Sequence, residues 1–139
     1  MASKPTDWDP KMLARFRELW GPDFIPPFPW LPEAREVFRP LSAAMGEILS
    51  RPTLDLKTRA VIIFSTMVAL GYKAEAKLYI QGLRNLGYST EQIAEIILQV
   101  ALYAGLPRGV DANMLLKEVV DEDKERAKAK GFFYQFPRS

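Results

Sequence analysis

The sequence GYKAEAKLYIQGLRNLG, from Gly71 to Gly87, decides the predicted fold, because it places a helical pattern between two glycines that can end helices. Read at about 100° per residue, this helix has one polar face. The polar face carries Lys73, Lys77, Gln81, Arg84 and Asn85. Glu75 lies opposite it with Tyr79 one turn later, so we expect a carboxylate and a phenol to project together into apolar surroundings. Burying an unpaired carboxylate is costly, which predicts that Glu75 is either paired or functional.

The segments before this helix predict three more. Asp9 and Pro10 are typical of a helix start, and the first helix is expected to end at Gly21. Residues 22–32 contain five prolines and predict an extended, apolar arm that covers a core, a neighbouring subunit or a ligand pocket. A second helix follows from Pro32, and Pro40 is expected to kink or split it. A third helix, over 56–70, is almost entirely apolar and predicts the central core helix, buried on nearly all sides.

Two more helices follow Gly87. Ser89 and Gln92 have the spacing of a capping box, which predicts a helix that Gly105 ends. The last helix is expected to run from there to about residue 130. The tail FFYQFPRS, residues 132–139, is strongly aromatic and is expected to dock onto a groove, in its own chain or across an interface. No stretch alternates like a strand, so the sequence predicts an all-α bundle of about six helices.

Length and composition narrow the function. A chain of 139 residues is expected to form a single domain, and its net charge of +2 comes from scattered basic residues that give no reason to expect a nucleic acid partner. The absence of cysteine excludes disulfides and thiol chemistry, and the absence of histidine removes the commonest general base and metal ligand. We therefore expect no metal and no cofactor. No run is apolar enough to span a membrane and residues 1–9 lack a signal-peptide core, so a cytoplasmic location is expected.

Four motifs within residues 54–120 point to a family. LDLKTR at 54–59, ALG at 69–71, YAGLP at 103–107 and Asp111–Ala112 resemble, in order and spacing, the carboxymuconolactone decarboxylase family, whose superfamily includes the alkylhydroperoxidase D-type proteins. The N-terminal 53 residues and the tail contribute nothing to this resemblance. It implies an all-helical fold that assembles as a homotrimer or homohexamer, with pockets between helices and subunits.

The departures from the family pattern affect the expected chemistry. The peroxidase branch needs a C-x-x-C pair followed by a histidine, and this chain has Tyr72, Glu75 and Tyr79 at those positions. That branch also carries a glutamate at the position of Ala60. Hydroperoxidase activity is therefore excluded. The decarboxylase branch carries E-L-x-x-H on this helix; Glu75 matches its glutamate and Tyr79 replaces its histidine. Asp111 stands near a second histidine position of that branch.

The retained groups suit a cofactor-independent lyase that acts on a small cyclic or conjugated carboxylic acid. Decarboxylation needs a site for developing negative charge and a donor that protonates the carbanion. We expect Glu75 to shuttle the proton, Tyr79 to donate a hydrogen bond to an enolate oxygen, and Asp111 to act as a second carboxylate. Substrate-binding candidates are Arg108 and Arg59, which can hold a carboxylate in a bidentate contact, together with Tyr72 and Tyr103.

Other functions remain open at this point. The same residues would serve a dehydratase or an isomerase. A non-catalytic ligand-binding or oligomeric scaffold is the other hypothesis, in which Glu75 pairs with Arg59, Arg84 or Arg108 at a subunit contact. A pocket lined by Glu75 and Tyr79 would favour an enzyme or binder, and a filled core would favour the scaffold.

Overall fold

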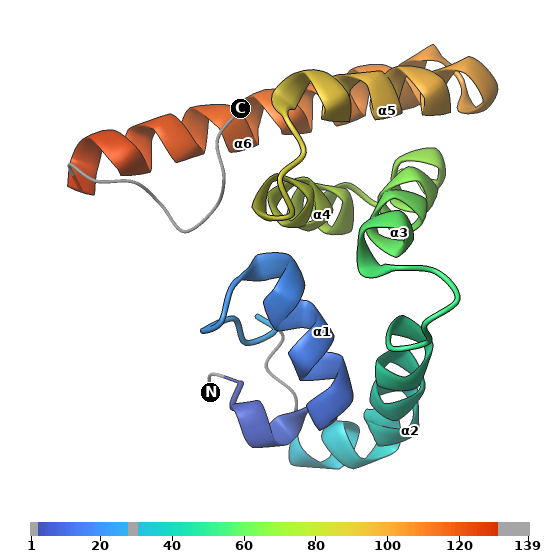
Figure 1. Ribbon diagram of the computed structural model, residues 1–139, viewed down its shortest axis with the longest axis vertical. Coiled ribbons are helices and arrows are strands. Elements are labelled where there is room, and N and C mark those ends of the chain that lie inside the picture. Colours follow the sequence, from blue (N-terminus) through green and yellow to red (C-terminus); the bar gives the residue numbers. More distant parts are fainter. Residues whose placement is uncertain (1–2, 28–30, 131–139) are drawn as a thin grey trace. The chain divides into compact units, whose positions relative to one another are not determined.

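The computed structural model describes residues 3–27 and 31–130, and within them all regular structure is helical (Figure 1). This confirms the all-α prediction with six α-helices. A short 3-10 helix, η1, precedes them at Pro5–Asp7. The α-helices are α1 (Pro10–Trp20), α2 (Pro32–Leu49), α3 (Leu56–Leu70), α4 (Lys73–Asn85), α5 (Thr90–Ala104) and α6 (Leu106–Lys130). The aromatic tail lies outside the described residues, so its docking stays a prediction.

The chain divides into two compact units, one up to Leu56 and one from Lys57 onward. In the first unit α1 packs on α2. Asp9 caps α1 as expected, because its carboxylate accepts the Met12 amide at 3.1 Å. Gly46 allows the close approach of the two helices, since a Cβ there would lie 2.6 Å from the Met12 nitrogen. The single-domain description stays a prediction.

The proline-rich arm follows α1 and packs partly against it. The Phe24 ring lies 4.8 Å from the Trp20 ring and 6.2 Å from the Phe16 ring, measured between centroids, and Arg17 donates to the Phe24 carbonyl at 3.2 Å. The arm therefore covers apolar surface of its own unit at this point, while residues 28–30 lie outside the described part. Pro40 does not split α2, which continues to Leu49 as one helix.

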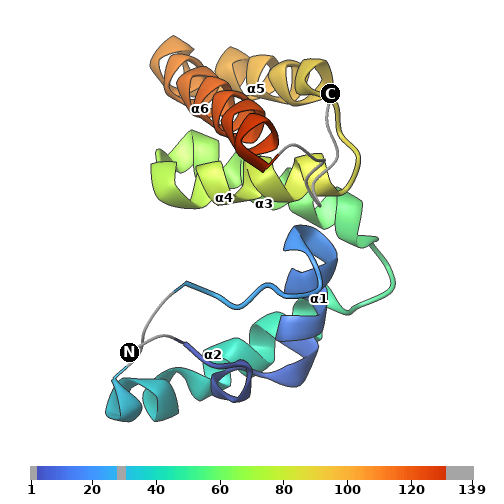
Figure 2. The ribbon, with the colours of Figure 1, turned by 90° about the vertical axis from the view of Figure 1, so that its left-hand side faces the viewer.

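The second unit is built in two layers, α5 and α6 over α3 and α4 (Figures 1 and 2). The closest helix pairs are α5 with α6 and α4 with α6. Local sequence determines the ends of these helices. The capping box is confirmed: Ser89 accepts the Gln92 amide at 3.0 Å, and the Gln92 side chain accepts the Ser89 amide at 2.9 Å.

The core of the second unit takes its α4 contribution from Ala76, Tyr79, Ile80 and Leu83, all buried. Arg84 is also buried, which corrects its predicted place on the polar face. Its Nε donates to Asp123 of α6 at 2.9 Å, and its Nη1 donates to Thr90 of α5 at 2.9 Å. The sequence pattern of α4 groups Arg84 with the exposed polar residues. It cannot show that Arg84 is buried, because Asp123, which pairs with Arg84, lies 39 positions further along the chain.

Helix α3 differs most from its prediction. Only Ala60, Phe64 and Val68 are buried, one stripe at a spacing of four residues, whereas Ile62 and Leu70 are about half exposed. An apolar helix is thus covered along a single stripe and open elsewhere in the isolated chain, so the prediction of burial on nearly all sides is wrong for one chain. None of the helices in the described residues is both long and apolar enough to cross a membrane.

Candidate functional site

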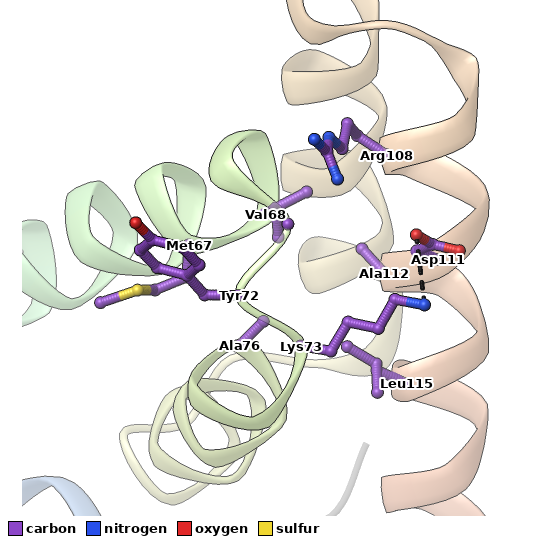
Figure 3. Close-up of a pocket in the computed structure, with 10 residues that line it drawn as sticks. Met67, Val68, Tyr72, Lys73, Ala76, Arg108, Asp111, Ala112 and Leu115 are labelled. Atoms are coloured by element: carbon purple, nitrogen blue, oxygen red, sulfur yellow. Dashed lines mark ion pairs between the residues drawn. The ribbon is translucent and has the colours of Figure 1, made fainter.

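A small hollow lies where α3 ends and where α4 and α6 begin (Figure 3). It measures about 10 Å³, which is about the space that one water molecule needs. Its lining comes from three helices and the turn between two of them: Met67, Val68, Gly71, Tyr72, Lys73, Ala76, Arg108, Asp111, Ala112 and Leu115. Three predicted site residues, Tyr72, Arg108 and Asp111, are therefore brought together.

Gly71 shapes one wall of this hollow. Its φ of +78° lies in the left-handed region, and the Gly71 amide donates to the Val68 carbonyl while the Tyr72 amide donates to the Met67 carbonyl. This is the Schellman arrangement that ends a helix at a glycine. A Cβ at Gly71 would lie 2.1 Å from Nη1 of Arg108. The glycine thus ends α3 and leaves the space that the Arg108 guanidinium occupies.

Arg108 lies in the first turn of α6, and its guanidinium points across to the end of α3 (Figure 3). Among the described residues no acidic side chain lies within ion-pair distance of it. The side chain is half-buried. A half-buried guanidinium without a counter-charge is suited to bind an external carboxylate, by two parallel hydrogen bonds.

Asp111 lies one turn further along α6 and pairs with Lys73, which the sequence pattern does not mark as a site residue. The Lys73 Nζ lies 3.6 Å from the Asp111 Oδ2, with 63% of the lysine side chain and 38% of the aspartate side chain exposed. The sequence predicts only that Lys73 lies on the polar face of its helix. Its position at the first residue of α4, directly after a glycine turn that faces α6, became apparent only with the fold.

Glu75 does not lie where the sequence predicted. It is exposed in the isolated chain, does not line the hollow, and forms no ion pair with Arg59, Arg84 or Arg108. The apolar face of α4 turns Ala76 and Tyr79 inward, and Glu75 falls beside that face. The predicted burial of Glu75 is therefore wrong for a single chain, and its catalytic role stays a prediction.

Tyr79 is buried in the core, 7% exposed, and lies outside the lining of the hollow. Burial raises the pKa of its phenol to about 12. The phenol therefore stays neutral and can only act as a hydrogen-bonding group near neutral pH. Neither Glu75 nor Tyr79 lines the small hollow or the larger one in the N-terminal unit, so the criterion that would favour an enzyme or binder is not met by these two hollows.

The other two predicted substrate contacts also lie outside the hollow. Arg59 is half-buried on α3, and Tyr103, near the end of α5, is 89% exposed. A larger hollow of about 560 Å³ lies in the N-terminal unit between η1, α1 and α2, but none of the predicted residues lines it. Within residues 3–27 and 31–130, no three acidic side chains are grouped so that they could hold a metal ion.

Taken together, the hollow offers two cations and one carboxylate beside an apolar floor, whereas the ring of Tyr72 points away from these charges toward Met67 (Figure 3). Such a site can bind a carboxylic acid through Arg108 and place a proton-transferring group, Asp111 or Lys73, near it. Its small volume means that a ligand lies over its rim rather than inside it. These charges are arranged so that they could hold an acid at the surface of a helical scaffold.

Comparison with known proteins identifies the family to which this helical chain belongs. The family model described as the carboxymuconolactone decarboxylase family matches residues 35–118, which is more than half of the chain. This chain therefore belongs to the carboxymuconolactone decarboxylase family. The match begins at residue 35, within α2, so the family region starts earlier than the predicted residue 54.

Two curated relatives are decarboxylases by name. The chain is 36% identical over 76 residues to 4-carboxymuconolactone decarboxylase of Acinetobacter baylyi, covering 55% of this chain and 57% of that protein. It is 25% identical over 87 residues to nitrosuccinic acid decarboxylase of Metarhizium robertsii, covering 63% of this chain and 61% of that protein. The chain thus spans about three-fifths of the length of these relatives.

Proposed function

We propose that this protein is a cofactor-independent decarboxylase acting on a small cyclic or conjugated carboxylic acid. The observation that carries the proposal is Arg108, a half-buried guanidinium with no acidic partner among the described residues, held against Gly71 beside Asp111. The family and the two named decarboxylases support the same class of reaction.

The reaction assigns different tasks to the residues. Arg108 would hold a carboxylate that stays on the substrate, so that the carboxylate to be lost lies over the rim of the hollow on the side of Lys73. The bond from that carboxyl carbon to its neighbour breaks, carbon dioxide leaves, and the electron pair moves into a conjugated carbonyl group. A proton then returns to the carbanion from the Lys73 ammonium, or from Glu75 if a second chain covers it.

We also propose that the working form is a homotrimer or homohexamer. Glu75, Tyr103 and much of α3 are exposed in one chain, although the resemblance implies pockets that involve neighbouring subunits. Self-association would cover these residues and would bring Glu75 into an enclosed environment. The proposed catalytic role of Glu75 depends on this assembly.

The test is turnover of a panel of cyclic and conjugated acids that includes 4-carboxymuconolactone and nitrosuccinic acid, with carbon dioxide release measured directly. Wild-type protein should release carbon dioxide, and Arg108→Gln should lower kcat/KM by about 10- to 100-fold, because charged hydrogen bonds contribute about 1.5–3 kcal/mol. Arg126→Gln is the matched control, since Arg126 lies far along α6 and pairs with Glu122. Loss of water, or isomerisation without loss of mass, would identify a dehydratase or isomerase instead.

A second candidate, a non-catalytic ligand-binding or scaffold protein, has its own support. Tyr79 replaces a family histidine and is enclosed in the core. In that case no acid in the panel would be consumed, whereas a carboxylic acid would still shift the amide resonances of Gly71 and Ala112. The Glu75→Gln variant separates the enzyme hypothesis from the scaffold hypothesis. If the protein is an enzyme, the variant should lose turnover with little change in stability. If it is a scaffold, the variant should change only the assembly of the subunits.

A further inference from the structure

We infer that Lys73 is a specificity-determining residue of this site. Lys73 binds a second acidic group of the ligand, and this group takes the place of Asp111 as the partner of the lysine. The inference rests on the proposed function only in taking the hollow as an acid-binding site. It adds the residue of this chain that recognises the second of two carboxylates on the ligand. Arg108 would hold the first and Lys73 the second.

The arrangement of charges around the hollow leads to this inference. Figure 3 shows Arg108 and Lys73 entering the site from different helices, α6 and α4, with Ala112 between them and Asp111 beside the lysine. The charged residues in its lining are these two cations and the one anion. Without a ligand, one of the two positive charges is uncompensated. An acid with a single carboxylate would satisfy Arg108 and leave the lysine with its internal partner.

The contact between Lys73 and Asp111 is suited to exchange. Its 3.6 Å separation between nitrogen and oxygen exceeds hydrogen-bond distance, and 63% of the lysine side chain is exposed. Exposed pairs of this kind contribute little to stability, so the lysine can leave Asp111 at small cost. Lys77, one turn along α4, is held differently: it pairs with both Glu118 at 3.3 Å and Glu122 at 2.7 Å.

The size of the hollow adds a further constraint. A volume of about 10 Å³ does not accommodate a ligand body. A ligand with an acidic group at each end can instead bridge Arg108 and Lys73 while its carbon chain lies over Ala112.

The experiment compares succinate with butyrate at fixed ionic strength, because the two have the same number of carbons and differ by one carboxylate. Binding is followed by the amide resonances of Gly71 and Ala112. Wild type should bind succinate at least tenfold more tightly than butyrate. Lys73→Met should reduce this preference to about onefold without weakening butyrate, and Arg108→Gln should weaken both acids.

Lys77→Met is the matched control and should leave the preference unchanged. The inference is overturned if wild type binds neither acid at these resonances, if it binds both equally, or if Lys73→Met keeps the preference. Failure of the proposed function appears differently: succinate is preferred through Lys73, yet no acid in the turnover panel loses carbon dioxide.

Discussion

Gly71 combines two properties in a single residue: a left-handed backbone and close approach to Arg108. Gly87 ends α4 in the same way, with φ of +99° and the amides of Gly87 and Tyr88 bonded to the carbonyls of Arg84 and Leu83. At Gly87, however, a Cβ would meet nothing within 4 Å. Both glycines are therefore needed for their positive φ, but only Gly71 is also needed to leave space for the Arg108 guanidinium.

Replacing each glycine by alanine tests this separation. Both Gly71→Ala and Gly87→Ala should lower the free energy of unfolding by about 1–2 kcal/mol, because an L-residue is strained at positive φ. Only Gly71→Ala should also weaken carboxylate binding, since the added methyl group displaces Arg108. Urea denaturation and ligand titration measure the two effects. Equal ligand affinity in the two variants would show that Gly71 has no role beyond ending α3.

Tyr79 makes stability depend on alkaline pH. Its pKa is raised by burial to about 12, whereas an unfolded tyrosine titrates near about 10. Below pH about 10 the phenol is protonated in both states. As pH rises from about 10 to about 12, the unfolded state loses its proton first, so the folded state loses up to about 2–3 kcal/mol of stability.

The measurement is urea unfolding at pH 9 and at pH 11.5 for wild type and for Tyr79→Phe. Wild type should lose about 2 kcal/mol more between these pH values than the variant does. The variant corrects for the titration of lysines and of the other tyrosines, which both proteins share. Parallel losses in the two proteins would mean that the phenol is not protected from ionisation.

At the scale of elements, a buried ion pair joins α4 to α6. Arg84 and Asp123 have side chains only 3% and 7% exposed, and Thr90 at the start of α5 accepts from the same guanidinium. Asp123→Asn should destabilise the protein by about 3–5 kcal/mol, because it leaves a buried charge without its partner. The control is Asp121→Asn, which removes an exposed pair with Lys117 and should change stability little.

Thermal and urea denaturation of these two variants provide the comparison. The double variant Arg84→Met, Asp123→Leu should recover much of the loss, because it removes both charges and keeps their volume apolar. A single Asp123→Asn variant as stable as Asp121→Asn would mean that water reaches Arg84 and replaces its partner.

The same elements explain what the sequence could and could not predict. Helix ends were predictable because Asp9, Ser89 and the glycines act on their own neighbours in the chain. Which side chains face inward was less predictable. Periodicity ranks the sides of a helix by polarity, but burial depends on partners from other helices. Arg84 was misplaced for this reason, and so was Glu75, whose side of α4 no described helix covers.

The candidate site was predicted in part for a similar reason. Arg108 and Asp111 were found because the resemblance highlighted the start of α6. The sequence does not identify Lys73, because Lys73 and Asp111 are 38 positions apart in the chain, from 73 to 111. Only the packing of α4 against α6 brings the two side chains together. No local signal distinguishes such a lysine from others on a solvated face.

At the scale of the whole molecule, exposed apolar residues gather at the turn from α5 to α6. Leu102 is 72% exposed, Leu106 is 73% exposed and Tyr103 is 89% exposed. Burying a large apolar side chain contributes about 1.5–3 kcal/mol, so covering this surface and the open sides of α3 would stabilise an assembly substantially. Exposed apolar surface of this extent is typical of an interface.

We therefore expect the wild-type protein to sediment as a trimer or hexamer, and Leu102→Glu to shift it toward the monomer by placing a charge in the apolar contact. Gln99→Glu is the matched control, because it adds the same charge at an exposed position on the same helix. Sedimentation velocity measures the mass of both variants. If Glu75 works only inside the assembly, Leu102→Glu should also lose turnover while Gln99→Glu keeps it. A wild-type protein that sediments as a monomer and still releases carbon dioxide would contradict both the assembly and the need to enclose Glu75.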